Sequence, residues 1–170
     1  MSQTAAQRGY TASGSRRNTR VRQWPAGPVI AKVHAPNGET FTIATVRSRV
    51  LRRNYVGLRL RFSSGRVIES AALRVMPALY WNVGRVCGSH PYGVMYGILH
   101  NSHDVASVRT VGHLEHLHPV PLKRGTPSPG AVVYKILTRT PGRLTVRVPT
   151  GRVYMEARVA SIYAETPCAR

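Results

Sequence analysis

Acidic residues are scarce in this chain of 170 residues, which has 6 Asp and Glu against 25 Lys and Arg and a formal net charge of +19. So few carboxylates offer no obvious paired-carboxylate site for acid–base catalysis. The sequence also contains no nucleophile-elbow, zinc-protease, Walker or dinucleotide-binding motif. We therefore expect no catalytic residues, no cofactor and no small-molecule substrate. A positive charge of this size favours a polyanionic partner.

Cysteine and long apolar runs are scarce as well. Cys87 and Cys168 are far apart in the sequence and belong to no Cys-x-x-Cys pair, so we expect neither a disulfide framework nor a four-cysteine zinc site. The most hydrophobic stretches are interrupted by Arg, Pro or Gly within a few positions. Because a membrane-spanning helix needs about 18 to 20 apolar residues, no membrane span is predicted.

Histidines are concentrated in one segment and could in principle supply metal ligands. Six of the seven lie between His90 and His118, and His113, His116 and His118 follow one another closely. Their spacing is not that of a known structural zinc site, and no cysteine accompanies them. We therefore expect no metal site and interpret these histidines as surface residues that contact RNA or solvent.

Arginine supplies almost all of the positive charge. The lysines are Lys32, Lys123 and Lys135, and the other 22 basic residues are arginines. A planar guanidinium can bind a phosphate through two hydrogen bonds and stack on a base, which a lysine ammonium cannot do, so this bias indicates structured nucleic acid. With 42% hydrophobic residues the chain can also bury a core, in one domain or two small ones.

Residues 1–24 form a basic arm. Five arginines lie there among Ser, Thr, Gln and Gly, and the first acidic residue of the chain is Glu39. This composition is typical of an organelle transit peptide, and also of an extension that becomes ordered against nucleic acid. We expect a retained arm that contacts RNA, and a solvated tail is the alternative.

Short runs rich in Val, Ile, Thr and Tyr, separated by Pro, Gly and Asn, follow from Trp24 onwards. This pattern predicts an all-β fold with few helices. The first three predicted strands are residues 28–34, 40–46 and 56–62.

The third of these strands has the clearest alternation. Leu58, Leu60 and Phe62 alternate with Arg59 and Arg61, so we expect the three apolar side chains to enter a core. The other face of the strand would then present two guanidiniums to RNA.

A hairpin of the same form occurs twice in the sequence. Residues 63–65 and 149–151 are predicted tight turns, each ending in Gly and each preceded by an apolar alternation. Residues 130–136 similarly resemble residues 27–33. These matched blocks predict two small barrels or one duplicated sheet. Between them, residues 87–127 are rich in Gly, His and Pro and are predicted to form one strand and long loops.

Arginines are densest between residues 47 and 66, where seven of them are interleaved with Val, Leu, Tyr55 and Phe62. A guanidinium placed on a phosphate releases counterions, and Tyr55 could stack on an exposed base. A solvated basic face is the alternative, but unpartnered charges at this density would repel one another. We therefore predict contact with RNA or DNA in this segment.

The segment from Val46 to Val67 resembles the SH3-like barrel of the universal large-subunit ribosomal protein two family, which carries the pattern V-x-R-x-G-x-Y-V-x-L-R-L-x-S-G-E. Here the matching core runs from Tyr55 through Gly65 as YVGLRLRFSSG, with Arg66 in place of the family's Glu. Three further stretches resemble that family: Pro25 to Ile30 its P-x-G-x-x-V strand, Asn82 to Arg85 its N-I-G-K segment, and Ser89 to Gly93 its histidine loop.

This resemblance implies a structural role, with an SH3-like barrel docked on large-subunit ribosomal RNA and neighbouring large-subunit ribosomal proteins as further partners. Together with the arginine bias and the transit-like arm, it indicates a mitochondrial ribosome, and another organellar or a cytoplasmic ribosome is the alternative. The chain would consist of a basic arm, an SH3-like barrel, a loop region, a second hairpin or barrel-like repeat and a tail: residues 1–24, 25–86, 87–127, 128–165 and 166–170. The residues predicted to contact RNA are Arg8, Arg16, Arg17, Arg20, Arg22, Arg47, Arg49, Arg52, Arg53, Tyr55, Arg59, Arg61, Arg66, Arg85, His90, Arg147 and Arg152.

Two other classes of protein would also fit a basic arm joined to a β-rich body. A small viral coat protein is expected to concentrate its arginines in the arm, whereas 17 of the 22 arginines here lie beyond residue 24. A free-standing RNA-binding protein is expected to bind RNA reversibly as a soluble monomer. A ribosomal protein of this charge is instead expected to aggregate or stay partly unfolded without its RNA.

Overall fold

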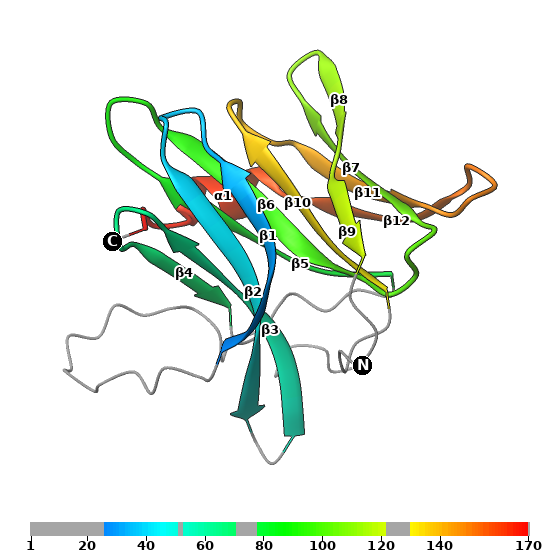
Figure 1. Ribbon diagram of the computed structural model, residues 1–170. Coiled ribbons are helices and arrows are strands. Elements are labelled where there is room, and N and C mark those ends of the chain that lie inside the picture. The colour runs from blue at the N-terminus through cyan, green and yellow to red at the C-terminus, as the bar shows by residue number, and fades with distance from the viewer. Residues whose placement is uncertain (1–25, 51–52, 71–77, 122–129, 170) are drawn as a thin grey trace, which may run out of the picture.

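A computed structural model of the protein describes residues 26–50, 53–70, 78–121 and 130–169. In these ranges all regular secondary structure is β-strand except for one short helix, so the all-β prediction is confirmed (Figure 1). The basic arm lies outside the described residues, and with it Arg8, Arg16, Arg17, Arg20 and Arg22. The elements are β1 (Ala26–His34), β2 (Thr40–Val50), β3 (Arg53–Phe62), β4 (Val67–Ser70), β5 (Leu79–Val86), β6 (Tyr92–Leu99), β7 (Val105–Thr110), β8 (His113–His116), β9 (His118–Pro121), β10 (Ala131–Leu137), β11 (Arg143–Arg147), β12 (Val153–Arg158) and α1 (Ala160–Glu165).

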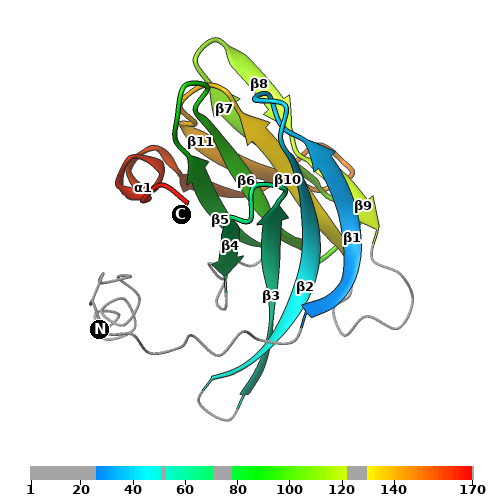
Figure 2. The ribbon, with the colours of Figure 1, turned by 60° about the vertical axis from the view of Figure 1, so that its left-hand side comes forward.

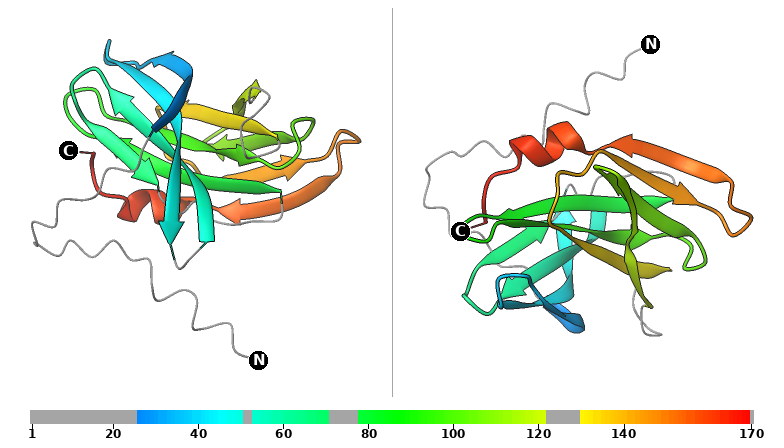
Figure 3. Two further views of the ribbon diagram at one scale, coloured as in Figure 1. Left: turned by 60° about the horizontal axis from the view of Figure 1, so that its bottom comes forward. Right: turned by 90° about the horizontal axis from the view of Figure 1, so that it is seen from above.

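The described strands form three antiparallel sheets of four strands each. Sheet A has the order β1-β2-β3-β4, sheet B has β5-β6-β10-β9, and sheet C has β12-β11-β7-β8. Sheet B is the middle layer: seen from above, the strands of sheet C and α1 lie on one side of β5 and β6, and the strands of sheet A lie on the other (Figure 3). No helix in the described part of the chain is long and apolar enough to cross a membrane.

Strand β6 shows why the middle sheet is buried on both faces. All eight of its residues are buried. Tyr92, Val94, Tyr96 and Ile98 belong to the core between sheets A and B, whereas the alternate positions face the core between sheets B and C, where Met95 and Leu99 pack. A continuous apolar run such as YGVMYGIL is the pattern expected of a strand covered on both faces.

The two cores draw on different sets of strands. The core between sheets A and B joins Phe41 and Ile43 of β2 to the three apolar residues of β3, which are all at most 2% exposed. The prediction that Leu58, Leu60 and Phe62 enter a core is therefore confirmed. The core between sheets B and C contains Trp81, Val83, Met95, Val108, Val133, Leu144 and Val146.

The predicted turns at residues 63–65 and 149–151 have the same geometry. Gly65 and Gly151 both have positive φ, at 91° and 85°, where a residue without a side chain is favoured. The flanking backbone closes both turns alike: the Phe62 N–H donates to the Arg66 carbonyl at 2.9 Å, and the Val148 N–H donates to the Arg152 carbonyl at 3.0 Å.

The repeat does not extend beyond these hairpins. In the first block the β3–β4 hairpin shares sheet A with β1, whereas in the second the β11–β12 hairpin lies in sheet C and β10 lies in sheet B. The described strands therefore do not form one duplicated sheet. Amphipathic alternation and turn chemistry are local features, so two hairpins can match in sequence while their surroundings differ.

Two other expectations about organisation need correction. The described part of the segment predicted as one strand and long loops, residues 87–121, contains four strands, β6 to β9, of which β8 and β9 are short, mostly exposed and rich in His and Pro. Strand β9 forms an edge of sheet B, where proline is tolerated because its missing N–H is not required by a neighbour. Residues 25–86, predicted as one barrel, are shared between two sheets, because β5 pairs with β6 in sheet B.

The carboxylate of Glu39 connects two turns of sheet A with β6. It accepts hydrogen bonds from the Asn37 side chain at 2.9 Å, from the Ser64 hydroxyl, and from the Tyr92 hydroxyl at 3.4 Å. Burial raises the pKa of Glu39, but the hydrogen bonds from Ser64 and Asn37 and the charge of Arg66 together lower it below its usual value. Burial, followed by the charge and hydrogen bond of Glu39, raises the pKa of Tyr92 to about 12.

Acid is expected to weaken this connection. Because the folded-state pKa of Glu39 is lowered, its contribution to stability is present above the unfolded-state pKa of 4.5 and is lost as the pH falls through the folded-state value. Urea unfolding at about pH 6, 4 and 3 should show that the Glu39→Gln variant loses less free energy of unfolding over this range than the unchanged protein. Parallel losses in the two proteins would contradict this assignment.

The C-terminal segment docks on sheet B, with α1 lying at the side of the sheets (Figure 2). Ile162 and Tyr163 pack against the core between sheets B and C. Arg85 of β5 lies over the Tyr163 ring, 5.2 Å from its centroid. Its Nη1 donates to the carbonyls of Ala164 and Thr166 at 3.3 and 3.4 Å, next to the end of the helix where cations are favoured.

Cys87 and Cys168 form a disulfide, which corrects the expectation that no disulfide would be present. Their Cα atoms are 5.6 Å apart although 81 positions separate them in the sequence. The Ala169 N–H donates to the Arg85 carbonyl at 2.7 Å, so backbone pairing brings the tail to the end of β5. Spacing along the chain could not predict this bridge, because it depends on where the tail docks.

Candidate nucleic-acid interface

Strands β2 and β3 continue as a two-stranded ribbon beyond their neighbours. Among the described residues, pairing of β1 with β2 reaches Val46 and pairing of β4 with β3 reaches Leu58, whereas β2 and β3 remain paired as far as Val50 and Arg53. Figure 1 shows this ribbon projecting away from the three sheets. We call residues 47–56 the arginine ribbon, because four of the ten are arginines.

Several predicted RNA contacts belong to this ribbon. The described backbone places these residues on a projecting hairpin, the kind of element that can enter a groove of a nucleic acid. Arg52 lies outside the described residues, as do the side chains of Arg47, Arg49, Arg53 and Tyr55.

A second set of arginines forms a row across the outer face of sheet C. Arg143 of β11 is directly opposite Arg158 of β12 on one side and Arg109 of β7 on the other. The alternate residues of β11 and β7, such as Leu144 and Val108, face the core, so the three arginines point away from it. All three are exposed. We call them the sheet C row.

The sheet C row concentrates positive charge with little compensation. Like charges directly opposite one another on neighbouring strands are unfavourable. Glu156 lies 3.2 Å from Arg143 (Oε2 to Nη1), but both side chains are about half exposed, and such a pair contributes roughly 0 to 1 kcal/mol. Within the described part of the chain, neither Arg109 nor Arg158 makes an ion pair. A bound polyanion would relieve this repulsion.

Arg59 is buried, although the sequence predicted that its side chain would be exposed. The residue is 5% exposed, and its Nε donates to Oε2 of Glu69 at 2.7 Å. Glu69 of β4 is the cross-strand partner of Arg59, so the ion pair joins two neighbouring strands of sheet A. The guanidinium of Arg59 is therefore buried in sheet A and not on an exposed face as expected, whereas Arg61 of the same strand is exposed.

The different environments of these two arginines give a direct test. Arg59→Ala should lower the free energy of unfolding by about 2 kcal/mol, because it leaves a half-buried carboxylate without its cation. Arg61→Ala should change it by less than about 0.5 kcal/mol, as expected of an exposed side chain. Urea unfolding of the two variants measures both values. Equal losses would show that the Arg59–Glu69 pair does not stabilise sheet A.

The other predicted residues have varied surroundings. Arg66 is half-buried beside Glu39, and Arg85 is engaged with α1 and the tail. His90 is exposed in the turn before β6, with its Nδ1 3.2 Å from the Ser89 hydroxyl. Arg147 and Arg152 are exposed in the β11–β12 hairpin, where Nη1 of Arg147 donates to the Gly151 carbonyl at 2.8 Å.

Sequence reasoning missed the sheet C row. Arg109, Arg143 and Arg158 lie in three strands and do not cluster in the sequence. Each alternates with apolar residues and could have been predicted to face outward on that signal. What the sequence does not show is that β11 pairs with both β7 and β12 in a register that aligns the three charges.

Comparisons with known proteins add nothing to this description. No family model matches the chain, and no curated protein or solved structure matches it significantly.

Proposed function

We propose that this protein binds RNA and acts as a structural component of a ribonucleoprotein particle. The observation that carries the proposal is the sheet C row, in which Arg109, Arg143 and Arg158 stand side by side and only Arg143, among these three described residues, has a carboxylate partner, the exposed Glu156. Arginines in this arrangement suit the regularly spaced phosphates of a nucleic-acid backbone. The projecting arginine ribbon and the net charge of +19 support the same partner.

The particle proposed first is the large subunit of a mitochondrial ribosome. The resemblance of residues 46–67 to a universal large-subunit protein supports this, and the transit-like arm supports the compartment. In this proposal ribosomal RNA covers the sheet C row and the ribbon, and neighbouring ribosomal proteins contact the remaining surface. Contacts of this kind are mainly to phosphate and sugar, which position a protein on RNA.

One observation favours a second candidate, a viral coat protein. The Cys87–Cys168 disulfide suits a protein that persists in an oxidising environment, such as a secreted protein or a virion, because disulfides are rare where thiols are kept reduced. A coat protein would bind its genome through the same arginines, so the nature of the bound RNA distinguishes the two candidates.

Sedimentation of the tagged full-length protein from its source cells tests both candidates. Sucrose-gradient fractions that contain the protein are sequenced for RNA. Comigration with an organellar large subunit, persisting in high salt, is the expected result. Comigration with particles that contain other RNA and no ribosomal RNA would replace the ribosome with a coat. Recovery at the top of the gradient, free of RNA, would contradict the structural role.

A further inference from the structure

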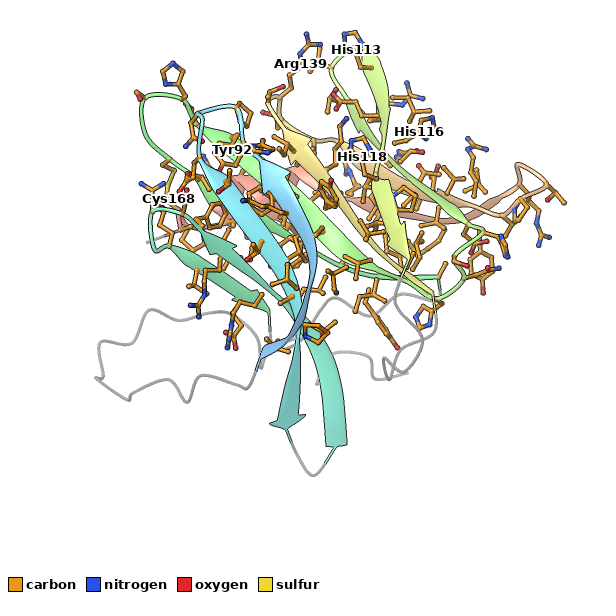
Figure 4. The ribbon with its side chains drawn as sticks, in the orientation of Figure 1. Tyr92, His113, His116, His118, Arg139 and Cys168 are labelled. Atoms are coloured by element: carbon orange, nitrogen blue, oxygen red, sulfur yellow. A yellow bond between two sulfur atoms is a disulfide. The ribbon has the colours of Figure 1, made fainter. Side chains whose placement is uncertain are left out.

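A cationic trough runs along one edge of the three-layered body, separate from the sheet C row. One hollow of about 520 Å³ is lined by β8, by the end of β10 and by the residues after it, and a second of about 340 Å³ is lined by the end of β1 and by β10. His118 and Lys135 line both hollows, which adjoin at the edge of sheet B: Tyr134 and Ile136 face the side of sheet A, and Lys135 faces the side of sheet C. Figure 4 shows His113, His116, His118 and Arg139 gathered in this region, at the same edge. We call the combined depression the trough.

The trough exists because β9 is shorter than its neighbour. Strand β9 pairs with residues Ala131 to Tyr134 of β10. Leu117, the residue before β9, is not part of sheet B. Residues 135–137 of β10 have no partner in β9, which leaves this stretch of the edge open between β1 on one side and β8 on the other. Both hollows are within the range of roughly 300 to 1,000 Å³ that is typical of ligand sites.

Its lining is strongly basic. Lys32, Lys135 and Arg139 are its lysine and arginine side chains. Glu115 is the acidic side chain among the described lining residues, and it is already engaged: Oε2 lies 3.3 Å from Nζ of Lys135, and Oε1 accepts a hydrogen bond from Thr110 at 3.2 Å. Because Glu115 offsets the charge of Lys135, the excess of positive charge in the trough comes from Lys32 and Arg139, and an anionic ligand suits it.

Rings lie beside these charges. The His118 and Tyr134 rings are in contact, with centroids 5.5 Å apart and planes tilted by 49°. His34, His113 and His116 supply further imidazoles along the lining. Aromatic rings interleaved with cations at intervals along a groove are the arrangement that binds single-stranded nucleic acid, because bases stack on the rings while phosphates meet the charges.

We propose that the trough binds a single-stranded segment of RNA, with phosphates on Lys32 and Arg139 and a base stacked on the His118–Tyr134 pair. This inference rests on the proposed function, since it assigns a second contact to the same partner. The sheet C row lies on the exposed outer face of a sheet and suits a double-stranded backbone, whereas the trough suits unpaired nucleotides. The protein thus holds a junction between a duplex and a single strand.

Fluorescence anisotropy with two labelled probes tests the proposal on the full-length protein. One probe is an oligouridine of about ten nucleotides, and the other is an RNA duplex of about twenty base pairs. In the trough variant, Lys32→Gln with Arg139→Gln, we expect the Kd for oligouridine to rise at least about tenfold and the Kd for duplex to change less than about twofold. His118→Ala, at an exposed position, should weaken oligouridine binding about fivefold.

The sheet C variant, in which Arg109, Arg143 and Arg158 are all Gln, serves as the matched comparison and should show the opposite preference. Unchanged oligouridine binding by the trough variant and by His118→Ala would overturn the trough, and the proposed function would stand if the sheet C variant still lost duplex. Failure of the unchanged protein to bind either probe would overturn both. Thermal unfolding of each variant confirms that the fold is intact.

Discussion

Replacing Arg109, Arg143 and Arg158 together by glutamine is expected to weaken binding of an RNA duplex on the order of 100-fold at low salt. Each of these side chains is exposed on the outer face of sheet C and aligned with the next across paired strands. A hydrogen bond to a charged group contributes about 1.5 to 3 kcal/mol, so the loss of three such contacts has a large effect. The slope of log Kd against log salt concentration should also fall by about 3, one unit for each lost phosphate contact.

A lysine triple variant is the control for this experiment. Lysine keeps the charge but lacks the planar fork, so the variant should retain most of the salt slope while binding less tightly than the unchanged protein. Titrations at several salt concentrations give both quantities. If the glutamine variant kept the affinity and the slope of the unchanged protein, the sheet C row would not be the RNA-binding face.

Gly97→Ala is expected to lower the free energy of unfolding by about 4 kcal/mol. A Cβ atom at this position would overlap the backbone carbonyl oxygen of Tyr80 and would lie 3.0 Å from the Cα of Trp81. Gly97 is paired with Trp81, so the added methyl group could be accommodated only if β5 and β6 moved apart. Because these strands belong to the middle sheet, such a shift would disturb both cores.

Gly84→Ala on β5 is the matched control. A Cβ there would meet the far end of the Ile68 side chain, which can rotate away, so the expected loss is about 1 kcal/mol. Denaturant unfolding measures both variants. Similar losses at the two positions would show that the approach of β5 to β6 is not what requires glycine at position 97.

The local features of the fold were predictable from the sequence because they depend on neighbouring residues. The alternation of Leu58, Leu60 and Phe62 predicted which side chains enter a core, and the glycine turns at 65 and 151 were predicted from turn chemistry. The same alternation failed at Arg59, because its burial depends on Glu69 in another strand. Alternation assigns a residue to a face of a sheet but does not show whether that face is covered.

Features that depend on distant parts of the chain were not predictable. The sheet C row requires the pairing of β11 with β7, and the trough requires β9 to be shorter than β10. The histidines of β8 and β9 were noticed as a group, but only the arrangement of the sheets places them beside Lys32 and Lys135. The charge of the sequence thus predicts a polyanionic partner, but the sequence alone locates only part of the surface proposed to bind it.

The disulfide also divides the chain into two parts that differ in their conformational freedom when the protein is unfolded. Residues 87–168 form a closed ring that contains β6 to β12 and α1, whereas all of sheet A and β5 lie outside it. A ring has fewer unfolded conformations than an open chain, so the strands inside it lose less entropy when they fold. The strands of sheet A, which carries the arginine ribbon, lie outside the ring and do not have this entropic advantage. We therefore expect the amide hydrogens of sheet A to exchange before those of sheet C, and we expect the sheet that presents the ribbon to adapt its shape most readily to the proposed RNA.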